Sequence, residues 1–110
     1  MNARTAEIKL TVDLDGENLP IRIKWQASES GEDEPKTCQS MMLSLWDDEK
    51  HTTATIDLWT RNMTVAEMNL HFYQVFRNMA DSYLNATTNA EGAKLIREFG
   101  DRFGKSVGLN

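Results

Sequence analysis

Residues 63–68 read Met-Thr-Val-Ala-Glu-Met, and they mark the point where a strand-forming sequence gives way to a helix-forming one. Thr64 as N-cap with Glu67 three residues later makes a capping box, in which each side chain bonds the main-chain N–H of the other residue. Met63 before the cap and Met68 at the fourth helical position make a hydrophobic staple. The stretch therefore predicts a helix that starts at Val65.

Two helices are expected after this start, over about residues 64–107. The first has apolar residues at intervals of three and four, the spacing of one helix face: Met68, Phe72, Val75, Phe76, Met79 and Tyr83. Residues 85–89 interrupt that pattern, and Thr88 with Glu91 repeats the capping box for a second helix. Gly100 and Gly104 should weaken the second helix by about 1 kcal/mol each relative to Ala, unless they let another backbone approach closely.

Four strands are expected before the helices, within about residues 6–60. Residues 7–14, 20–25 and 52–59 alternate apolar and polar side chains, which is the period of a half-buried strand. Residues 37–46 read as a strand with apolar groups on both faces. Strands followed by helices favour an α+β fold, a four-stranded antiparallel sheet followed by two C-terminal helices packed on one face.

Between the second and third strands, residues 27–36 carry four acidic side chains and little apolar surface. Such a segment buries too little to pack and repels itself, so we expect a mobile acidic loop. At 110 residues the chain has room for one hydrophobic core, which predicts a single domain over residues 1–110.

The charge balance excludes some partners. Seventeen acidic and twelve basic side chains give a net charge of −5, which disfavours nucleic acid as a partner. No apolar run resembles a signal peptide or a membrane span, so we expect a cytoplasmic protein with no membrane insertion. The single cysteine, Cys38, has no partner for an internal disulfide, as is common in a reducing compartment.

The sequence predicts no catalytic residue, no metal site and no cofactor. The two histidines, His51 and His71, have no spacing to carboxylates or to Cys38 that matches a ligand set or a triad. The acidic turn at residues 47–49 lacks the alternating ligands and the glycine of a calcium loop. We therefore expect a protein that is not an enzyme.

The strongest functional signal is aromatic. Met42, Trp46 and Trp59 have the opposite parity to the inward residues of their strands, so they should share the sheet face away from the helices. Large aromatics and Met on a polar face are enriched at protein interfaces. In the alternative interpretation, the strands end near these residues and each Trp folds over an edge or under a loop.

Several segments together resemble the gliding motility-associated protein GldC family. They are Leu45-Trp46-Asp47, Asp57-Leu58-Trp59-Thr60, the helix start with Met63 and Met68, and Phe99-Gly100-Asp101-Arg102-Phe103. The resemblance covers almost the whole chain. It implies a small cytoplasmic accessory protein of gliding bacteria, associated with the machinery for surface movement and its linked secretion system, with no enzymatic activity assigned to the family.

Three hypotheses from different classes follow. The first is an adaptor that uses Met42, Trp46 and Trp59 to bind a protein of the gliding or secretion machinery, or to form a homodimer or higher homo-oligomer. The second is an export or assembly chaperone like SecB, an analogy that rests on element order. The third is a small-molecule-binding domain with a pocket between sheet and helices, lined by His71, Asp57 or Tyr83.

Overall fold

The computed structural model describes residues 3–28 and 34–109, and it divides the chain into two compact units. The sheet unit is Met1–Met63 and the helical unit is Thr64–Asn110, so the border falls at the predicted capping box. An α+β fold with two C-terminal helices is confirmed. The predicted packing of the helices on a sheet face and the single domain stay predictions. Within the predicted acidic loop, residues 29–33 lie outside the described residues.

A three-stranded antiparallel sheet opens the sheet unit. It consists of β1 (Ile8–Leu14), β2 (Pro20–Ala27) and β3 (Lys36–Cys38), in the order β1-β2-β3. Leu10 pairs with Trp25 and Val12 with Ile23, so the apolar residues of β1 and β2 share one face, as the alternation predicts. Ile23 in the middle strand is completely buried, which places the core of this unit on that face.

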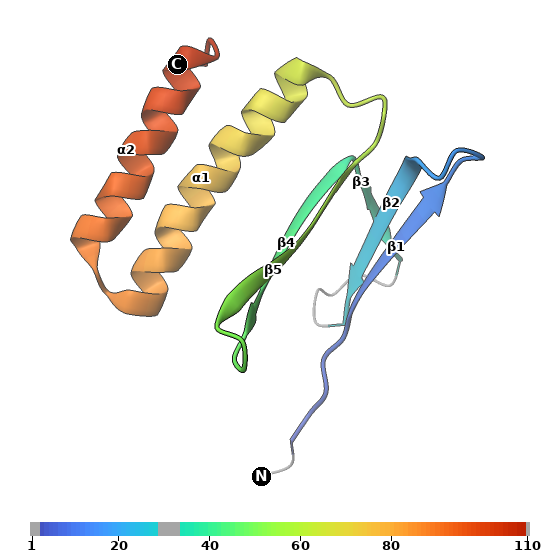
Figure 1. Ribbon diagram of the computed structural model, residues 1–110, viewed down its shortest axis with the longest axis horizontal. Coiled ribbons are helices and arrows are strands. Elements are labelled where there is room, and N and C mark those ends of the chain that lie inside the picture. The colour runs from blue at the N-terminus through green and yellow to red at the C-terminus, as the bar shows by residue number, and fades with distance from the viewer. Residues whose placement is uncertain (1–2, 29–33, 110) are drawn as a thin grey trace. The chain divides into compact units, whose positions relative to one another are not determined.

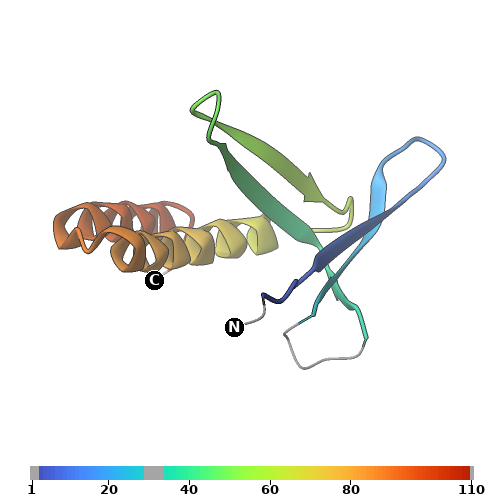
Figure 2. The ribbon, with the colours of Figure 1, turned by 90° about the horizontal axis from the view of Figure 1, so that it is seen from below.

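A second sheet has two antiparallel strands, β4 (Ser40–Asp47) and β5 (Thr52–Trp59). Figures 1 and 2 show β3 running on into β4, with the two sheets spreading apart from the point where they join. Gln39 is the residue between the two strands. The main-chain N–H of Thr60, just after β5, donates a 2.8 Å hydrogen bond to the carbonyl oxygen of Gln39 at this junction.

The prediction of one four-stranded sheet is therefore wrong, because the strand expected at residues 37–46 is two strands. β3 pairs with β2, whereas β4 pairs with β5. Side chains alternate along a strand, so a continuous strand would place Cys38 on the face opposite to Met41 and Leu43. The interruption at Gln39 removes this conflict, and Cys38 pairs with the buried Ile23.

The turn between β1 and β2 is organised by Asp15. Its Oδ1 accepts hydrogen bonds from the main-chain N–H groups of Leu19 (3.1 Å) and Glu17 (2.8 Å), and its Oδ2 lies 2.7 Å from Nη1 of Arg61. The bonds from Leu19 and Glu17, and then the guanidinium of Arg61, hold the pKa of Asp15 below its usual value. Asn18 takes a positive φ of 64° in the same turn.

The helical unit is an antiparallel pair of helices, α1 (Val65–Thr87) and α2 (Ala90–Ser106). The predicted start is confirmed, because Thr64 Oγ1 accepts from the N–H of Glu67 at 3.1 Å and Glu67 Oε1 accepts from the N–H of Thr64 at 2.9 Å. These bonds satisfy main-chain donors that have no partner within the helix.

The second predicted capping box is wrong. Thr88 ends α1 in the left-handed conformation, with φ of 57° and its N–H bonded to the carbonyl oxygen of Leu84. The N-cap of α2 is instead Asn89, whose Oδ1 accepts from the N–H of Gly92 at 3.0 Å. Asn caps a helix as well as Thr does, and an N-cap needs extended backbone that Thr88 does not adopt. α1 also continues through residues 85–87, where the apolar pattern breaks.

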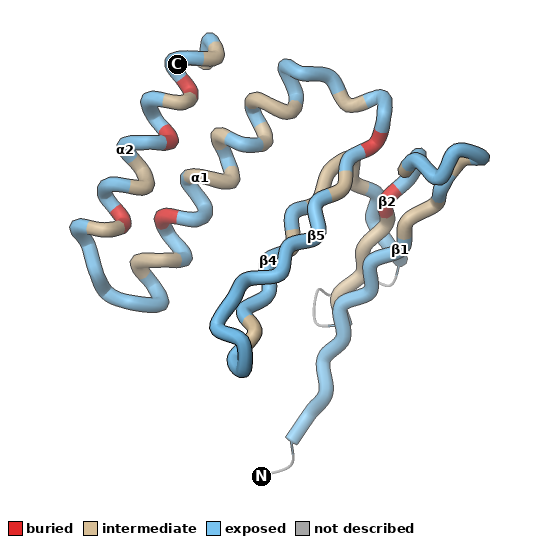
Figure 3. Tube along the Cα trace, in the orientation of Figure 1, coloured by how far each residue is buried: buried red, intermediate tan, exposed pale blue. Residues whose placement is uncertain are grey.

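The glycines of α2 leave room for aromatic side chains of α1. The sequence alone allowed another backbone as the neighbour of these glycines. A Cβ added to Gly104 would lie 2.8 Å from the ring of Tyr73, and one added to Gly100 would lie 3.0 Å from Cβ of Phe76. The buried residues of α2 face α1 (Figure 3), and Ala80 of α1 is buried as well. The glycines therefore favour the hairpin while they disfavour the isolated helix.

The close contact between Gly104 and the Tyr73 ring predicts that Gly104→Ala destabilises the protein. Helix propensity alone would make the substitution stabilising by about 1 kcal/mol. Because the new Cβ would meet the Tyr73 ring at 2.8 Å, we expect a net loss of about 1–3 kcal/mol in the free energy of unfolding, measured by urea denaturation.

Gly16→Ala serves as the matched control, because no atom lies within 4 Å of an added Cβ there, and it should leave stability nearly unchanged. A Gly104→Ala protein more stable than the wild type would contradict the close packing of the two helices.

The Asp15 turn predicts a pH dependence. A carboxyl group whose pKa is lower in the folded state stabilises the fold above its unfolded pKa, about 4, and loses that contribution as pH falls through the folded value. Asp15→Asn keeps an oxygen for Glu17 and Leu19 but loses the charge. The variant should be less stable than the wild type at pH 7, and the difference should shrink as the pH is lowered below 4, as measured by urea denaturation. A difference that stays constant with pH would count against the assigned bonds.

Candidate protein-interaction surface

The predicted aromatic residues lie on one face of the β4–β5 ribbon. Directly opposed residues of an antiparallel pair point to the same side of the sheet, and Ser40 pairs with Trp59, Met42 with Asp57 and Trp46 with Thr53. The other face carries a continuous apolar set made of Met41, Leu43, Leu45, Ile56 and Leu58. The two faces of the ribbon therefore differ, with aromatic and polar residues interleaved on one and aliphatic residues on the other.

The register separates the three predicted residues into two places. Met42 is a diagonal neighbour of Trp59, which corresponds to about 7–8 Å. Trp46 lies four residues further along β4, about 13 Å from Met42, and its ring stacks on His51 with centroids 6.0 Å apart. The structure thus brings Met42 and Trp59 together but does not bring Trp46 to them.

All three side chains are substantially exposed. The exposed fraction is 36% for Met42, 56% for Trp59 and 64% for Trp46. Trp46 contacts the turn residue His51, which takes a positive φ of 54°. Even so, most of the Trp46 surface stays accessible. Such residues expose much apolar surface to water. Because covering this surface is favourable, it favours contact with another molecule.

A cleft of about 340 Å³ lies beside Trp59. Leu19 from the turn between β1 and β2 and Pro20 from the start of β2 line one side, and the end of β5 supplies Leu58 and Trp59. The ion pair between Arg61 and Asp15 at 2.7 Å joins these two segments across 46 positions of sequence. We call the group formed by Met42, Trp59, Leu19 and Pro20 the Trp59 surface.

The sequence did not identify Leu19, Pro20 or Arg61 as parts of a site. Leu19 and Pro20 read as the entry to a strand, and nothing in the sequence connects Arg61 with Asp15. A single clue was the Asp-Gly-Glu-Asn turn at residues 15–18, whose first side chain binds its own turn and Arg61. Proximity of the turn to the end of β5 appears only in the folded chain.

The Trp59 surface is mostly apolar around two charged groups. Its cleft carries one acidic group, Asp57, and one basic group, Arg61, beside apolar walls. Burial raises the pKa of the Cys38 thiol, which disfavours the nucleophilic thiolate. Within residues 3–28 and 34–109, no three His, Cys, Asp or Glu side chains are grouped as a metal site would need. His71 lies on α1 with a buried Nε2 that has no hydrogen-bond partner among the described groups, and Tyr83 accepts a bond from Asn89.

Comparisons with known proteins add the family. No helix in the described part of the chain has the length and apolar character needed to cross a membrane. Searches among curated proteins and among solved structures find no match. The family model of the gliding motility-associated protein GldC-like matches residues 20–109, which include β2 through α2 and the segments around Trp46 and Trp59. Because the match spans far more than half of its length, the chain belongs to the GldC-like family of gliding motility-associated proteins.

Proposed function

We propose that this protein is a non-enzymatic adaptor of the gliding motility machinery and acts in the cytoplasm by binding another protein. Association with gliding motility follows from family membership. The Trp59 surface is the single observation that supports the binding role, because it combines an exposed Trp, a neighbouring Met and a cleft in one place. Residues of these types dominate the binding energy of protein interfaces.

The exposed area of Trp59 is large enough to matter for affinity. A Trp side chain buries about 150–250 Å² in full, so the 56% that is exposed corresponds to roughly 80–140 Å². At about 25 cal/mol per Å², covering it contributes about 2–3.5 kcal/mol, or a factor of about 30–300 in affinity. Most residues of an interface contribute far less than this.

A rigid support favours the same surface. The Asp15 turn is held by two hydrogen bonds from main-chain N–H groups to the Asp15 carboxylate and by Arg61, so Leu19 and Pro20 are presented in a defined position. A site that is already ordered loses less conformational entropy on binding. The Trp59 surface is therefore a better candidate than Trp46, which stands apart beside the β4–β5 turn.

Substitution of Trp59 tests the proposal in a gliding bacterium that carries the gene. Trp59→Asp in place of the native gene should abolish or strongly reduce colony spreading, because a charge replaces the apolar anchor. The purified variant should keep its melting temperature within a few degrees, since Trp59 is more than half exposed.

Val65→Asp is the matched control, because Val65 is 77% exposed and an Asp in the first turn of α1 is compatible with the helix dipole. It should spread like the wild type. Normal spreading by both Trp59→Asp and Met42→Asp would refute the assigned surface, whereas normal spreading of a gene deletion would refute the role in gliding.

The SecB-like alternative predicts a different behaviour toward unfolded proteins. An adaptor binds one folded partner, so equimolar protein should not slow the aggregation of a heat-denatured model enzyme, followed by light scattering. Suppression of aggregation that is lost in Trp59→Asp would instead support a chaperone that uses the same surface. Light scattering of the pure protein would also show whether a homodimer or a higher homo-oligomer forms.

A further inference from the structure

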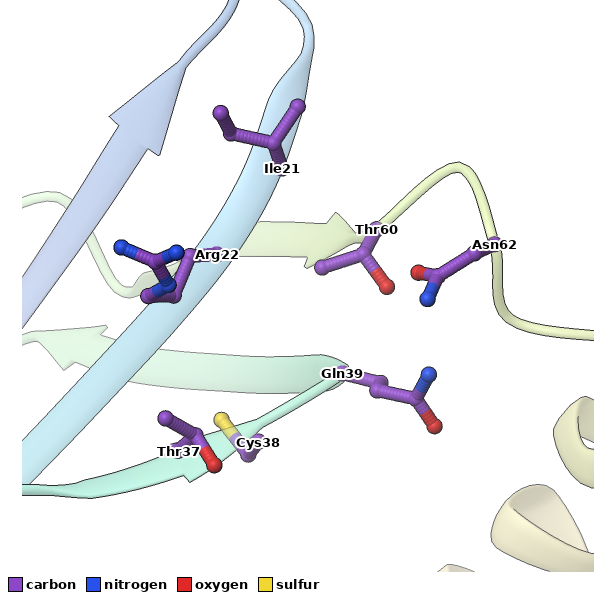
Figure 4. A pocket seen from close by; sticks show the side chains of 7 residues that line it. All are labelled: Ile21, Arg22, Thr37, Cys38, Gln39, Thr60 and Asn62. Atoms are coloured by element: carbon purple, nitrogen blue, oxygen red, sulfur yellow. The ribbon is translucent and has the colours of Figure 1, made fainter.

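A second pocket, of about 530 Å³, lies where β2 loses its neighbour strand. β3 pairs with β2 only from Ile23 to Trp25, because the chain leaves this sheet at Gln39 to form β4. On that side Ile21 and Arg22 pair with no strand among the described residues. Figure 4 shows these two residues opposite Gln39, Thr60 and Asn62, with Thr37 and Cys38 below.

Thr60 carries the unusual feature of this pocket. The residue is 2% exposed, and its Oγ1 makes no hydrogen bond to any described group of the protein. A buried hydroxyl without a partner destabilises a fold, because the hydrogen bonds that it loses to water are not replaced. Its main-chain N–H is used in the bond to Gln39, but the side-chain hydroxyl points into the pocket (Figure 4).

Neutral groups that both donate and accept surround this hydroxyl. Figure 4 shows the carboxamides of Gln39 and Asn62 on the same side of the pocket as Thr60 Oγ1. Each carboxamide offers two N–H donors and one oxygen acceptor, and the hydroxyl offers one donor and two lone pairs. The charged group of the pocket, the guanidinium of Arg22, is directed away from them and lies 3.4 Å from Asp13.

This chemistry matches the peptide group. A peptide unit presents one N–H and one C=O and no charge, so paired carboxamides can bind both at once. The open side of β2 adds main-chain groups. The register with β1 shifts from the pair Asp13 and Arg22 to the pair Leu14 and Pro20, so Ile21 is an extra residue with no partner in β1, and such a residue is left unpaired by the ladder. Addition of an extended segment to a sheet edge is a common mode of peptide recognition.

We propose that this pocket binds the main chain of an extended polypeptide segment, held by the Gln39 and Asn62 carboxamides, the Thr60 hydroxyl and the open edge of β2. Its volume lies in the range of pockets that hold small ligands, so it takes a few residues and not a folded surface. Ile21 and Cys38 form the apolar part of the lining and suit a small aliphatic side chain. The site is separate from the Trp59 surface and stands without the proposed role in gliding.

The test uses the blocked peptide acetyl-Val-Ala-Val-amide as probe and ¹⁵N-labelled full-length protein. Titration to millimolar peptide should give saturating amide shifts at residues 21–22, 37–39 and 60–62. Replacing the N–H of the central peptide unit by an ester oxygen should weaken binding, because the carboxamide oxygens then lose their donor. Acetate at the same concentrations should give no such shifts.

Two variants separate binding from stability. Thr60→Val removes the hydroxyl while it keeps the shape, so it should weaken peptide binding by about fivefold or more and raise the melting temperature by about 2–5 °C. Asn62→Ala changes an exposed side chain and should weaken binding similarly with no effect on melting. Thr55→Val, at an exposed position of β5, should bind the peptide like the wild type.

Three results would overturn the proposal. They are the absence of saturable shifts at the pocket, unchanged affinity in both Thr60→Val and Asn62→Ala, and the same shifts with acetate, which would identify a carboxylate site. Because gliding is not measured, none of them bears on the Trp59 surface.

Discussion

The architecture of the sheet unit depends on an interruption at Gln39, where the inward side chains change from even-numbered to odd-numbered positions. Cys38 pairs with the buried Ile23 and shares its face, whereas the aliphatic residues of β4 occupy odd positions. In one continuous strand, even and odd positions lie on opposite faces, so Cys38 and these aliphatic residues could not share a face. The chain resolves the conflict by leaving one sheet and starting another. The bond from the Thr60 N–H to the Gln39 carbonyl oxygen then ties the end of β5 to this point. The separation into two sheets, the burial of Thr60 and the open edge of β2 all follow from this one interruption.

The helical unit illustrates how tertiary contacts change the meaning of a residue. Glycine within a helix is unfavourable because its backbone is ordered at a high entropic cost. In α2 the same absence of Cβ admits the ring of Tyr73 at Gly104 and Phe76 at Gly100, so two long helices approach closely enough to bury Ala80 and Ala93. Close approach of the helices outweighs the weak propensity of α2, and the aromatic pair of Phe76 and Phe103, 5.4 Å apart, packs between them.

Local signals were predicted well where each depends on neighbours in sequence. The capping box of Thr64 and Glu67 and the strand at residues 7–14 both have their causes within a few residues. Prediction failed where two local signals compete, since Thr88 and Asn89 are both acceptable caps and the backbone of Thr88 turned left-handed. For the site, alternation placed Met42 and Trp59 on one face, but the cleft beside them needs the distant pair of Asp15 and Arg61.

The sequence by itself determined the α+β class, the border between sheet and helices, and the family, because periodicity, caps and family motifs are properties of short stretches read in order. Only the tertiary structure decided that the strands divide into sheets of three and two, that Trp46 stands apart from Trp59, and that the Thr60 hydroxyl is buried without a partner. These features arise from register and from contacts between residues tens of positions apart. The two-residue alternation along a strand predicts which face of the sheet a side chain lies on. It does not predict which strand pairs with that strand.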